Sequence, residues 1–362
     1  MLILFQNVLN IAAEVKHHLS PYFSGLVFHK GRKTCKSMAR GLMLPVKKFY
    51  ESFKCEIDKI ASIKSILAMI AKKISPLDEM RALVIDGTSL AKPFAKKIEN
   101  LSVDYDGVIK RVGQGLSIMV VGLVINDNII PLDFSFWYNK KKKEISKRKK
   151  NKDRKSANDQ YKTKIDLAID LIKVWKELLV FYYVALDGAF ASLKMISFCE
   201  SESLKYSMRM PRSRKVVING LELKLSDHPS LKLVRNERCK SAQGFYKGIV
   251  CFFTAHKRKK RNGGWEIIFI VSNMELSAKE HVAAYNKRWV IDKSFRTMKQ
   301  YFGLTDCQML RGLRQALHVF NVFLAYSFGT IEKIFNKKNC VEDIINGWRN
   351  SKKIQNIFET ND

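Results

Sequence analysis

The chain has 362 residues, of which 65 are Lys or Arg and 34 are Asp or Glu, so its formal net charge is +31. Its hydrophobic content of 46% excludes a disordered chain, and no stretch reaches the roughly 18 uninterrupted apolar residues of a membrane span. The positive charge predicts a polyanionic partner. Nucleic acid is favoured over an anionic membrane surface, because neutralising phosphates releases counterions.

The first 80 residues are predicted to be mainly helical, because apolar positions recur at helical spacing in residues 9–19 and 60–74. The apolar start has no basic leader and is interpreted as a core helix rather than a signal peptide. A basic segment lies between the two helices, with the cations Lys30, Arg32, Lys33, Lys36 and Arg40. It fits either a helix-turn-helix fragment that grips DNA or a plain basic surface.

Two apolar runs are interpreted as buried strands, and each ends in Asp-Gly. The first, residues 82–85, ends at Asp86, and the second, residues 178–186, ends at Asp187. Between them, residues 115–125 and 129–137 are joined by Asn-Asp-Asn, which predicts a β-hairpin. The chain therefore places two carboxylates at the predicted ends of two strands.

Charged and β-rich segments follow. From Lys140 to Lys155, eleven of sixteen residues are Lys or Arg, which suits a solvated arm for nucleic acid. Helices are predicted over residues 159–178 and again after Asp187, and a β-rich stretch covers about residues 206–273 with a second basic cluster at 257–261. A further long apolar helix is predicted over residues 308–336.

A helix is predicted between Ser277 and Gly303. Ser277 and Glu280 form a capping box, and Gly303 is a natural stop. Tyr285, Arg288, Asp292 and Lys299 are spaced by three, four and seven residues, so they share a helix face about 60° wide. Ala284, Ile291, Phe295, Met298 and Phe302 form the neighbouring apolar face. Taken alone, this pattern is more often a solvated surface.

Three carboxylates in this order suggest a metal site. Asp86, Asp187 and Asp292 would repel one another unless a cation held them together. Mg²⁺ prefers hard oxygen ligands, and two such ions can activate a water or a 3′-hydroxyl at a phosphodiester. A strand-ending turn is the alternative interpretation of each Asp-Gly alone. The seven cysteines lack zinc-ligand spacing and predict reduced thiols in a cytosolic protein.

The stretches VIDGTSL, ALDGAF and YNKRWVIDKSFRTMK together resemble a known family. They are similar to the first-Asp strand, the second-Asp strand and the Tyr-x2-Arg-x3-Glu-x6-Lys signature of bacterial DDE transposases. Within that class the chain is most similar to the insertion-sequence-four family. The resemblance implies a mixed α/β fold with an RNase H-like (retroviral-integrase-like) catalytic core over 81–205 and 274–337. It also implies a β-rich insertion at 206–273, after a helical region at 1–80 with a possible DNA-binding role and before a tail at 338–362.

The resemblance also implies cut-and-paste DNA transposition through a DNA hairpin. Asp86, Asp187 and Asp292 would be the catalytic metal ligands, holding two Mg²⁺ or Mn²⁺ ions. Tyr285, Arg288, Lys299 and Arg296 would contact DNA. Trp265 and Trp289 could stack on an unpaired base, although ordinary packing is preferred for both. The expected partners are the double-stranded ends of the element, target DNA and a second copy in a dimer, in a bacterial, nucleoid-associated setting.

One residue departs from the family pattern. The third carboxylate is Asp292 where the family has Glu, and the missing methylene removes on the order of 1.5 Å of reach. Since metal distances tolerate only about ±0.2 Å, the sequence leaves two hypotheses open. The chain is either an active metal-dependent transposase or a decayed or repurposed DNA-binding protein. A hydrolytic nuclease without strand transfer is a weaker third possibility.

Overall fold

The computed structural model describes residues 21–74, 80–106, 111–138, 162–260, 262–338 and 340–350. Three predicted segments lie outside the described residues: the helix at 9–19, the basic run at 140–155 and the last twelve residues of the tail. Within the described part, no helix combines the length and apolar character needed to cross a bilayer.

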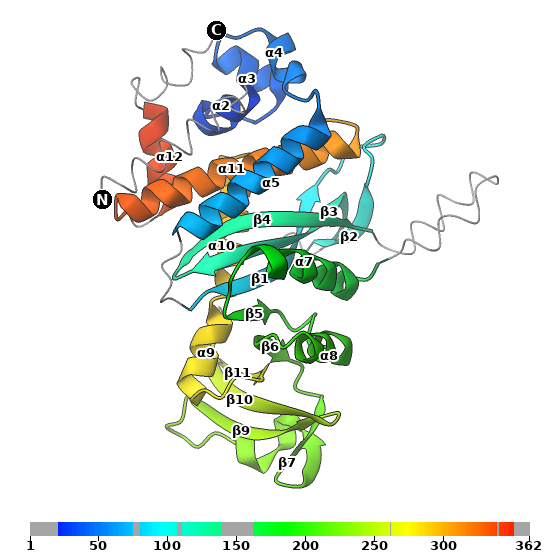
Figure 1. Cartoon of the computed structure of the whole chain (residues 1–362), viewed down its shortest axis with the longest axis vertical. Helices are drawn as coiled ribbons and strands as arrows, with labels where there is room; N and C mark the ends of the chain where they lie inside the picture. Colours follow the sequence, from blue (N-terminus) through cyan, green and yellow to red (C-terminus); the bar gives the residue numbers. More distant parts are fainter. Residues whose placement is uncertain are drawn as a thin grey trace, which may run out of the picture.

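A single mixed sheet of eleven strands runs through the molecule (Figure 1). Its order is β2-β3-β1-β5-β6-β11-β10-β9-β7-β8, and β4 pairs with β3. Strands β4, β3 and β1 are antiparallel, whereas β1, β5 and β6 are parallel. This arrangement confirms the predicted RNase H-like core. The strands are β1 Ala82–Ala91, β2 Ser102–Asp106, β3 Arg111–Ile125, β4 Asn128–Trp137, β5 Tyr183–Leu186, β6 Tyr206–Met210, β7 Lys215–Ile218, β8 Leu221–Lys224, β9 Cys239–Tyr246, β10 Ile249–Lys259 and β11 Trp265–Ser272.

The β-rich stretch after the second Asp-Gly continues this same sheet. Strand β6 pairs with β5 on one edge and with β11 on the other, so the core and the insertion share hydrogen-bonded strands. A turn joins β7 and β8 at Asn219 and Gly220, which have φ of 52° and 76°, in the left-handed region that such turns require. The predicted β3–β4 hairpin also forms, with Asn126 at φ 54°.

Helices cover the core part of the sheet. In Figure 1, α5 and α11 lie together along one side of β4, and α7 lies on its other side. Phe134 of β4 packs against Phe320 and Phe323 of α11, which anchors this helix to the sheet. The helices are α2 Pro21–Phe28, α3 Cys35–Gly41, α4 Val46–Glu51, α5 Glu56–Ile74, α7 Lys164–Leu178, α8 Leu193–Ser201, α9 Ala278–Asn286, α10 Trp289–Tyr301, α11 Gly312–Phe335 and α12 Val341–Asn350.

Three local predictions were wrong. The first strand does not end at Asp86 but continues to Ala91, because β3 pairs with it along its whole length. The predicted helix over 277–303 is two helices, α9 and α10, separated at Lys287 and Arg288. Lys33, placed among the surface cations, is buried, and desolvation lowers its pKa to about 6. The other four cations of that segment are exposed.

Candidate active site

The register of the parallel strands brings the first two acidic residues together. Ile85 of β1 pairs with Leu186 of β5, and the next residues along the two strands are Asp86 and Asp187. Neighbouring strands lie about 5 Å apart, so these carboxylates begin from adjacent positions. Strand β5 stops at Leu186 while β1 runs on to Ala91. Beyond Ile85, no described strand pairs with that edge of β1.

Arg288 joins the first and third carboxylates. Its Nη1 donates to Asp86 Oδ2 at 2.7 Å and to Asp292 Oδ2 at 3.0 Å. The guanidinium is buried, with 5% of the side chain exposed, whereas 19% of Asp86 and 43% of Asp292 are exposed. The structure therefore brings Asp86 and Asp292, which are far apart in sequence, to one cation.

The break between α9 and α10 places this arginine. The backbone N–H of Arg288 donates to the carbonyl of Tyr285, and the N–H of Ile291 donates to the carbonyl of Arg288. These bonds span three residues instead of four, which tightens the turn. The capping box of Ser277 and Glu280 begins α9 as predicted, and Gly303, at φ 65°, follows the end of α10. The apolar face predicted for this segment is buried throughout, from Ala284 to Phe302.

Tyr285 lies on the side of the second carboxylate. Its ring is buried and its hydroxyl is 3.5 Å from Asp187 Oδ1, a distance at the limit of a hydrogen bond. Burial raises the pKa of the tyrosine. The residue thus faces Asp187 in this conformation, and its contact with DNA stays a prediction.

Burial sets the protonation of the two carboxylates that Arg288 binds. Desolvation raises the pKa of Asp86 to about 7; Arg288 and the backbone N–H of Gly87 oppose the rise, and Asp292 and Asp187 add to it. Desolvation also raises the pKa of Asp292, and Arg288 again opposes it. The three carboxylates are therefore electrostatically coupled, and the cation lowers the cost of ionising two of them.

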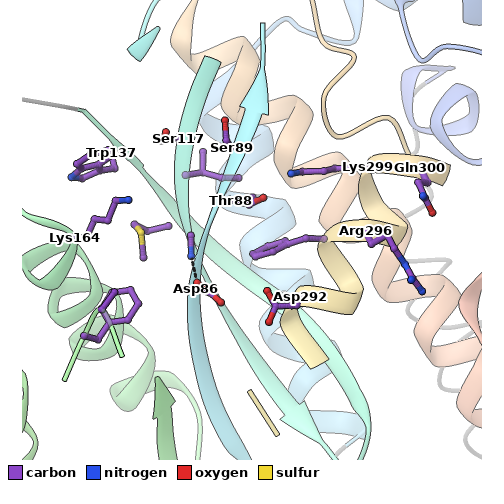
Figure 2. Close-up of a pocket in the computed structure, with 16 residues that line it drawn as sticks. Asp86, Thr88, Ser89, Ser117, Trp137, Lys164, Asp292, Arg296, Lys299 and Gln300 are labelled. Atoms are coloured by element: carbon purple, nitrogen blue, oxygen red, sulfur yellow. Dashed lines mark hydrogen bonds between the residues drawn. The ribbon is translucent and has the colours of Figure 1, made fainter. Parts of the chain in front are cut away.

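A cavity of about 740 Å³ opens at this point (Figure 2). Asp86 and Asp292 line it, and Arg296, Lys299 and Gln300 of α10 lie on the same side of β1 as Asp292. Trp137 and Lys164 lie on the other side of β1. Two of the three predicted catalytic acids, Asp86 and Asp292, thus share one cavity with the predicted cations of α10, whereas Asp187 is not among its lining residues. The size of the cavity suits a small ligand or part of a larger one.

Cations and indole rings lie next to one another from Arg288 to the insertion. Arg288 lies 4.5 Å from the ring centre of Trp289, and Arg258 of β10 lies 5.5 Å from the same ring. Farther out, Arg238 and Lys257 lie 5.6 and 5.4 Å from the ring of Trp265. Trp265 and Trp289 are half exposed and pack against these cations, and stacking of either ring on a base stays a prediction.

The donor chemistry of the site fits a divalent ion. Asp86 and Asp292 already converge on one cation, and hard oxygen ligands are what Mg²⁺ and Mn²⁺ take. In this conformation that cation is Arg288. Within the described residues, no three His, Cys, Asp or Glu side chains are grouped closely enough to hold a metal ion.

The sequence did not identify some residues of the site. Trp137 and Lys164 belong to the cavity, and Arg258 and Arg238 belong to the cation–indole series. The register of the strands could have indicated Trp137. This residue ends β4 and pairs with Ser117 of β3, which in turn pairs with Ser89 of β1, three residues beyond Asp86. The other contacts depend on how α7 and the insertion pack, which periodicity does not show.

Comparison with known proteins gives two family matches. A family model described as DDE superfamily endonuclease matches residues 5–232, and one described as transposase DDE domain matches residues 154–328. The first match includes Asp86 and Asp187, and the second includes Asp187 and Asp292. No curated protein matches the chain.

Proposed function

The chain belongs to the DDE superfamily of endonucleases, and from this we propose that it is a cut-and-paste transposase of the insertion-sequence-four type. Such an enzyme cuts DNA at the ends of its element and joins the freed ends to target DNA. The observation that carries the proposal is the convergence of Asp86 and Asp292 on one buried cation beside Asp187, at a cavity with further cations. The family generally uses divalent metal ions.

Asp86, Asp187 and Asp292 are the residues that would hold these ions, which we propose to be two Mg²⁺ or Mn²⁺. When bound, such ions activate a water or a 3′-hydroxyl and stabilise the leaving oxygen at phosphorus. Arg288 competes with them for Asp86 and Asp292, so it must turn away when metal enters. Its new partner would be a DNA phosphate, which a guanidinium can bind through two hydrogen bonds.

The remaining cations would hold the DNA. Lys299 and Arg296 line the cavity beside Asp292 and would contact phosphates next to the cleaved bond. The series from Trp289 to Trp265 offers cations for phosphates and indole faces for unpaired bases. After cleavage, the freed 3′-hydroxyl would form a hairpin that is reopened before joining, in a dimeric complex that holds both ends.

The test uses a plasmid that carries the DNA segment encoding the chain, with its flanking ends. The wild type should cut at these ends with Mn²⁺ or Mg²⁺, and Asp86→Ala should abolish cutting. Asp227→Ala is the matched control, because Asp227 is an exposed aspartate of the insertion far from the site. Absence of cutting by the wild type with either metal would reject the proposal.

The alternative function is DNA binding without catalysis, favoured by the short third carboxylate. Asp292 binds Arg288 four residues away on the same helical path, and it lacks the methylene that the family's Glu would extend toward the ions. Under this alternative, Asp292→Glu should create cleavage that the wild type lacks. Equal cleavage by both proteins would exclude it. Joining of a pre-cut end to plasmid would separate a transposase from a simple nuclease.

A further inference from the structure

The cavity has a second side that the proposed chemistry does not use. Strand β1 passes through the cavity at Asp86–Ser89, and its edge there has no described strand partner, because β5 stops at Leu186. Asp292 and the cations of α10 lie on one side of this edge (Figure 2). Trp137 and Lys164 lie on the other side, and Met119 and Phe190 also line the cavity. The cavity therefore continues around the edge of β1, away from the carboxylates.

Trp137 dominates this second side. It ends β4 and pairs across the sheet with Ser117, which pairs with Ser89, so three side chains form a row on one face. The Nζ of Lys164, in the first turn of α7, lies 4.1 Å from the centre of the Trp137 ring. The indole Nε1 is buried and has no hydrogen-bond partner among the described residues. An indole donor normally finds a partner when buried.

The position of the row relative to the acids sets what can bind there. Ser89 is three residues from Asp86 along β1, which corresponds to about 10 Å at the usual rise of a strand. Successive phosphates of an extended single strand are separated by a somewhat shorter distance than this. Trp137 lies two strands beyond Ser89, about a further 10 Å across the sheet. About two nucleotides of a single strand can thus bridge from the carboxylates to the indole, whereas a base-paired duplex does not fit a cavity of about 740 Å³.

We propose that the side of the cavity marked by Trp137 and Lys164, with Met119 and Phe190 also in the cavity lining, receives the base of an unpaired nucleotide within about two nucleotides of the phosphate bound at the carboxylates. This inference rests on the proposed function and names the form of DNA that the site takes. The indole and the apolar neighbours hold the flat base, and Lys164 binds a phosphate of the same strand. The hydroxyls of Ser117 and Ser89 offer hydrogen bonds that any base can accept or donate.

The first test maps the contact directly. The wild-type chain is mixed with a short duplex that carries an unpaired extension containing iodo-deoxyuridine, irradiated, and its peptides are analysed by mass spectrometry. We expect a cross-link in the peptide that contains Trp137. Cross-links confined to the peptides of Trp265 and Trp289 would overturn the proposal.

The second test measures affinity with two probes. Trp137→Ala should weaken binding of the extended duplex by about 5- to 150-fold, the range for loss of one stacked base, and should leave binding of the blunt duplex unchanged. Trp137→Phe should keep most of the affinity, because its ring can still stack on a base. If Trp137→Ala does not fold, the cross-link to the wild type decides the proposal. Equal weakening of both probes, or of neither, would overturn the proposal.

The two proposals fail separately. Cleavage of the plasmid by the wild type without a cross-link at Trp137 rejects the base site and leaves the nuclease function in place. A cross-link at Trp137 in a protein that cuts no DNA rejects the nuclease function and retains the base site. A 2-aminopurine base in the extension gives a further readout, because stacking on the indole quenches its fluorescence.

Discussion

Removal of the Arg288 cation is the perturbation that tests the site most directly, and Arg288→Met is the variant of choice because it keeps much of the side-chain volume. The buried bond to Asp86 dominates the effect, since removing one partner of a buried ion pair costs about 3–5 kcal/mol. The bond to Asp292 adds only about 0.3–0.5 kcal/mol, because that carboxylate is 43% exposed and the pair is an i,i+4 pair. We expect a loss of unfolding free energy near the lower end of this range.

The loss should depend on pH with a definite sign. Asp86 already has a pKa raised to about 7 in the folded protein, so the folded state binds more protons than the unfolded state between about pH 4 and 7, and stability falls as pH rises through this window. Without Arg288 the folded pKa rises further. The stability difference between variant and wild type should therefore be smallest below about pH 4, where both carboxyls are protonated, and largest above about pH 8.

Chemical denaturation followed by circular dichroism measures this difference at several pH values, without added metal. Asp86→Asn combined with Arg288→Met should recover most of the loss, because the uncompensated charge is then absent. Mn²⁺ should also stabilise Arg288→Met more than the wild type, since the ion no longer competes with the guanidinium. A loss below about 1 kcal/mol, or one independent of pH, would refute the assignment of Arg288 as the counter-ion of Asp86.

Three further predictions concern the ion site and the loop after α10. Asp86→Asn should lose the rise in melting temperature that Mn²⁺ gives the wild type, as measured by differential scanning fluorimetry; an equal rise in both would place the ion elsewhere. Gly303→Ala should cost about 1–2 kcal/mol of unfolding free energy, because Gly303 has φ 65° and a Cβ there would collide with Lys33. The matched Gly347→Ala in α12, where an added Cβ meets nothing, should be neutral or stabilising, and equal effects of the two would contradict this account. Lys92→Met should cost about 1–3 kcal/mol of unfolding free energy, because Lys92 Nζ donates to the carbonyls of Thr305 and Cys307 at 2.6 and 2.5 Å and their loss leaves buried acceptors unpaired; an unchanged denaturation midpoint would contradict it.

Local patterns predicted much of the fold because they act over short distances. The capping box at Ser277 and Glu280, the turn at Asn126 and the apolar face from Ala284 to Phe302 all formed as expected. The order of strands and acidic residues, together with the resemblance to a known family, indicated the RNase H-like core. The cap, the turn and the apolar face each depend only on residues near them in the sequence, and the order of the elements can be read along the chain without knowing their contacts.

Other features depend on partners that are distant in sequence. The length of β1 beyond Asp86 is set by pairing with β3, so a pattern that stops at the Asp-Gly pair underestimates it. Lys33 is buried because Gly25 and Asp306 accept hydrogen bonds from its side chain and backbone, respectively. Trp137 and Lys164 meet only after α7 packs on β4. Periodicity within one segment carries no information on such contacts.

Because the predicted helix is divided in two, this segment packs against both the insertion strands and the core strands of the sheet. Helix α9 packs on β5, β6, β9, β10 and β11, whereas α10 packs on β1, β4, α11 and α12. Arg288 lies at the junction, bonded to Asp86 of the core and stacked on Trp289, whose other cation, Arg258, comes from the insertion. A straight helix would fix α9 and α10 as one rod. The tightened turn at Arg288 instead lets each helix follow its own strands. Under the proposed binding of DNA along the insertion, Arg258→Ala should weaken DNA binding in a fluorescence-anisotropy titration. It should not alter the pKa of Asp86, because Arg258 pairs with Glu266 rather than with that carboxylate. An unchanged affinity would contradict a DNA contact at Arg258.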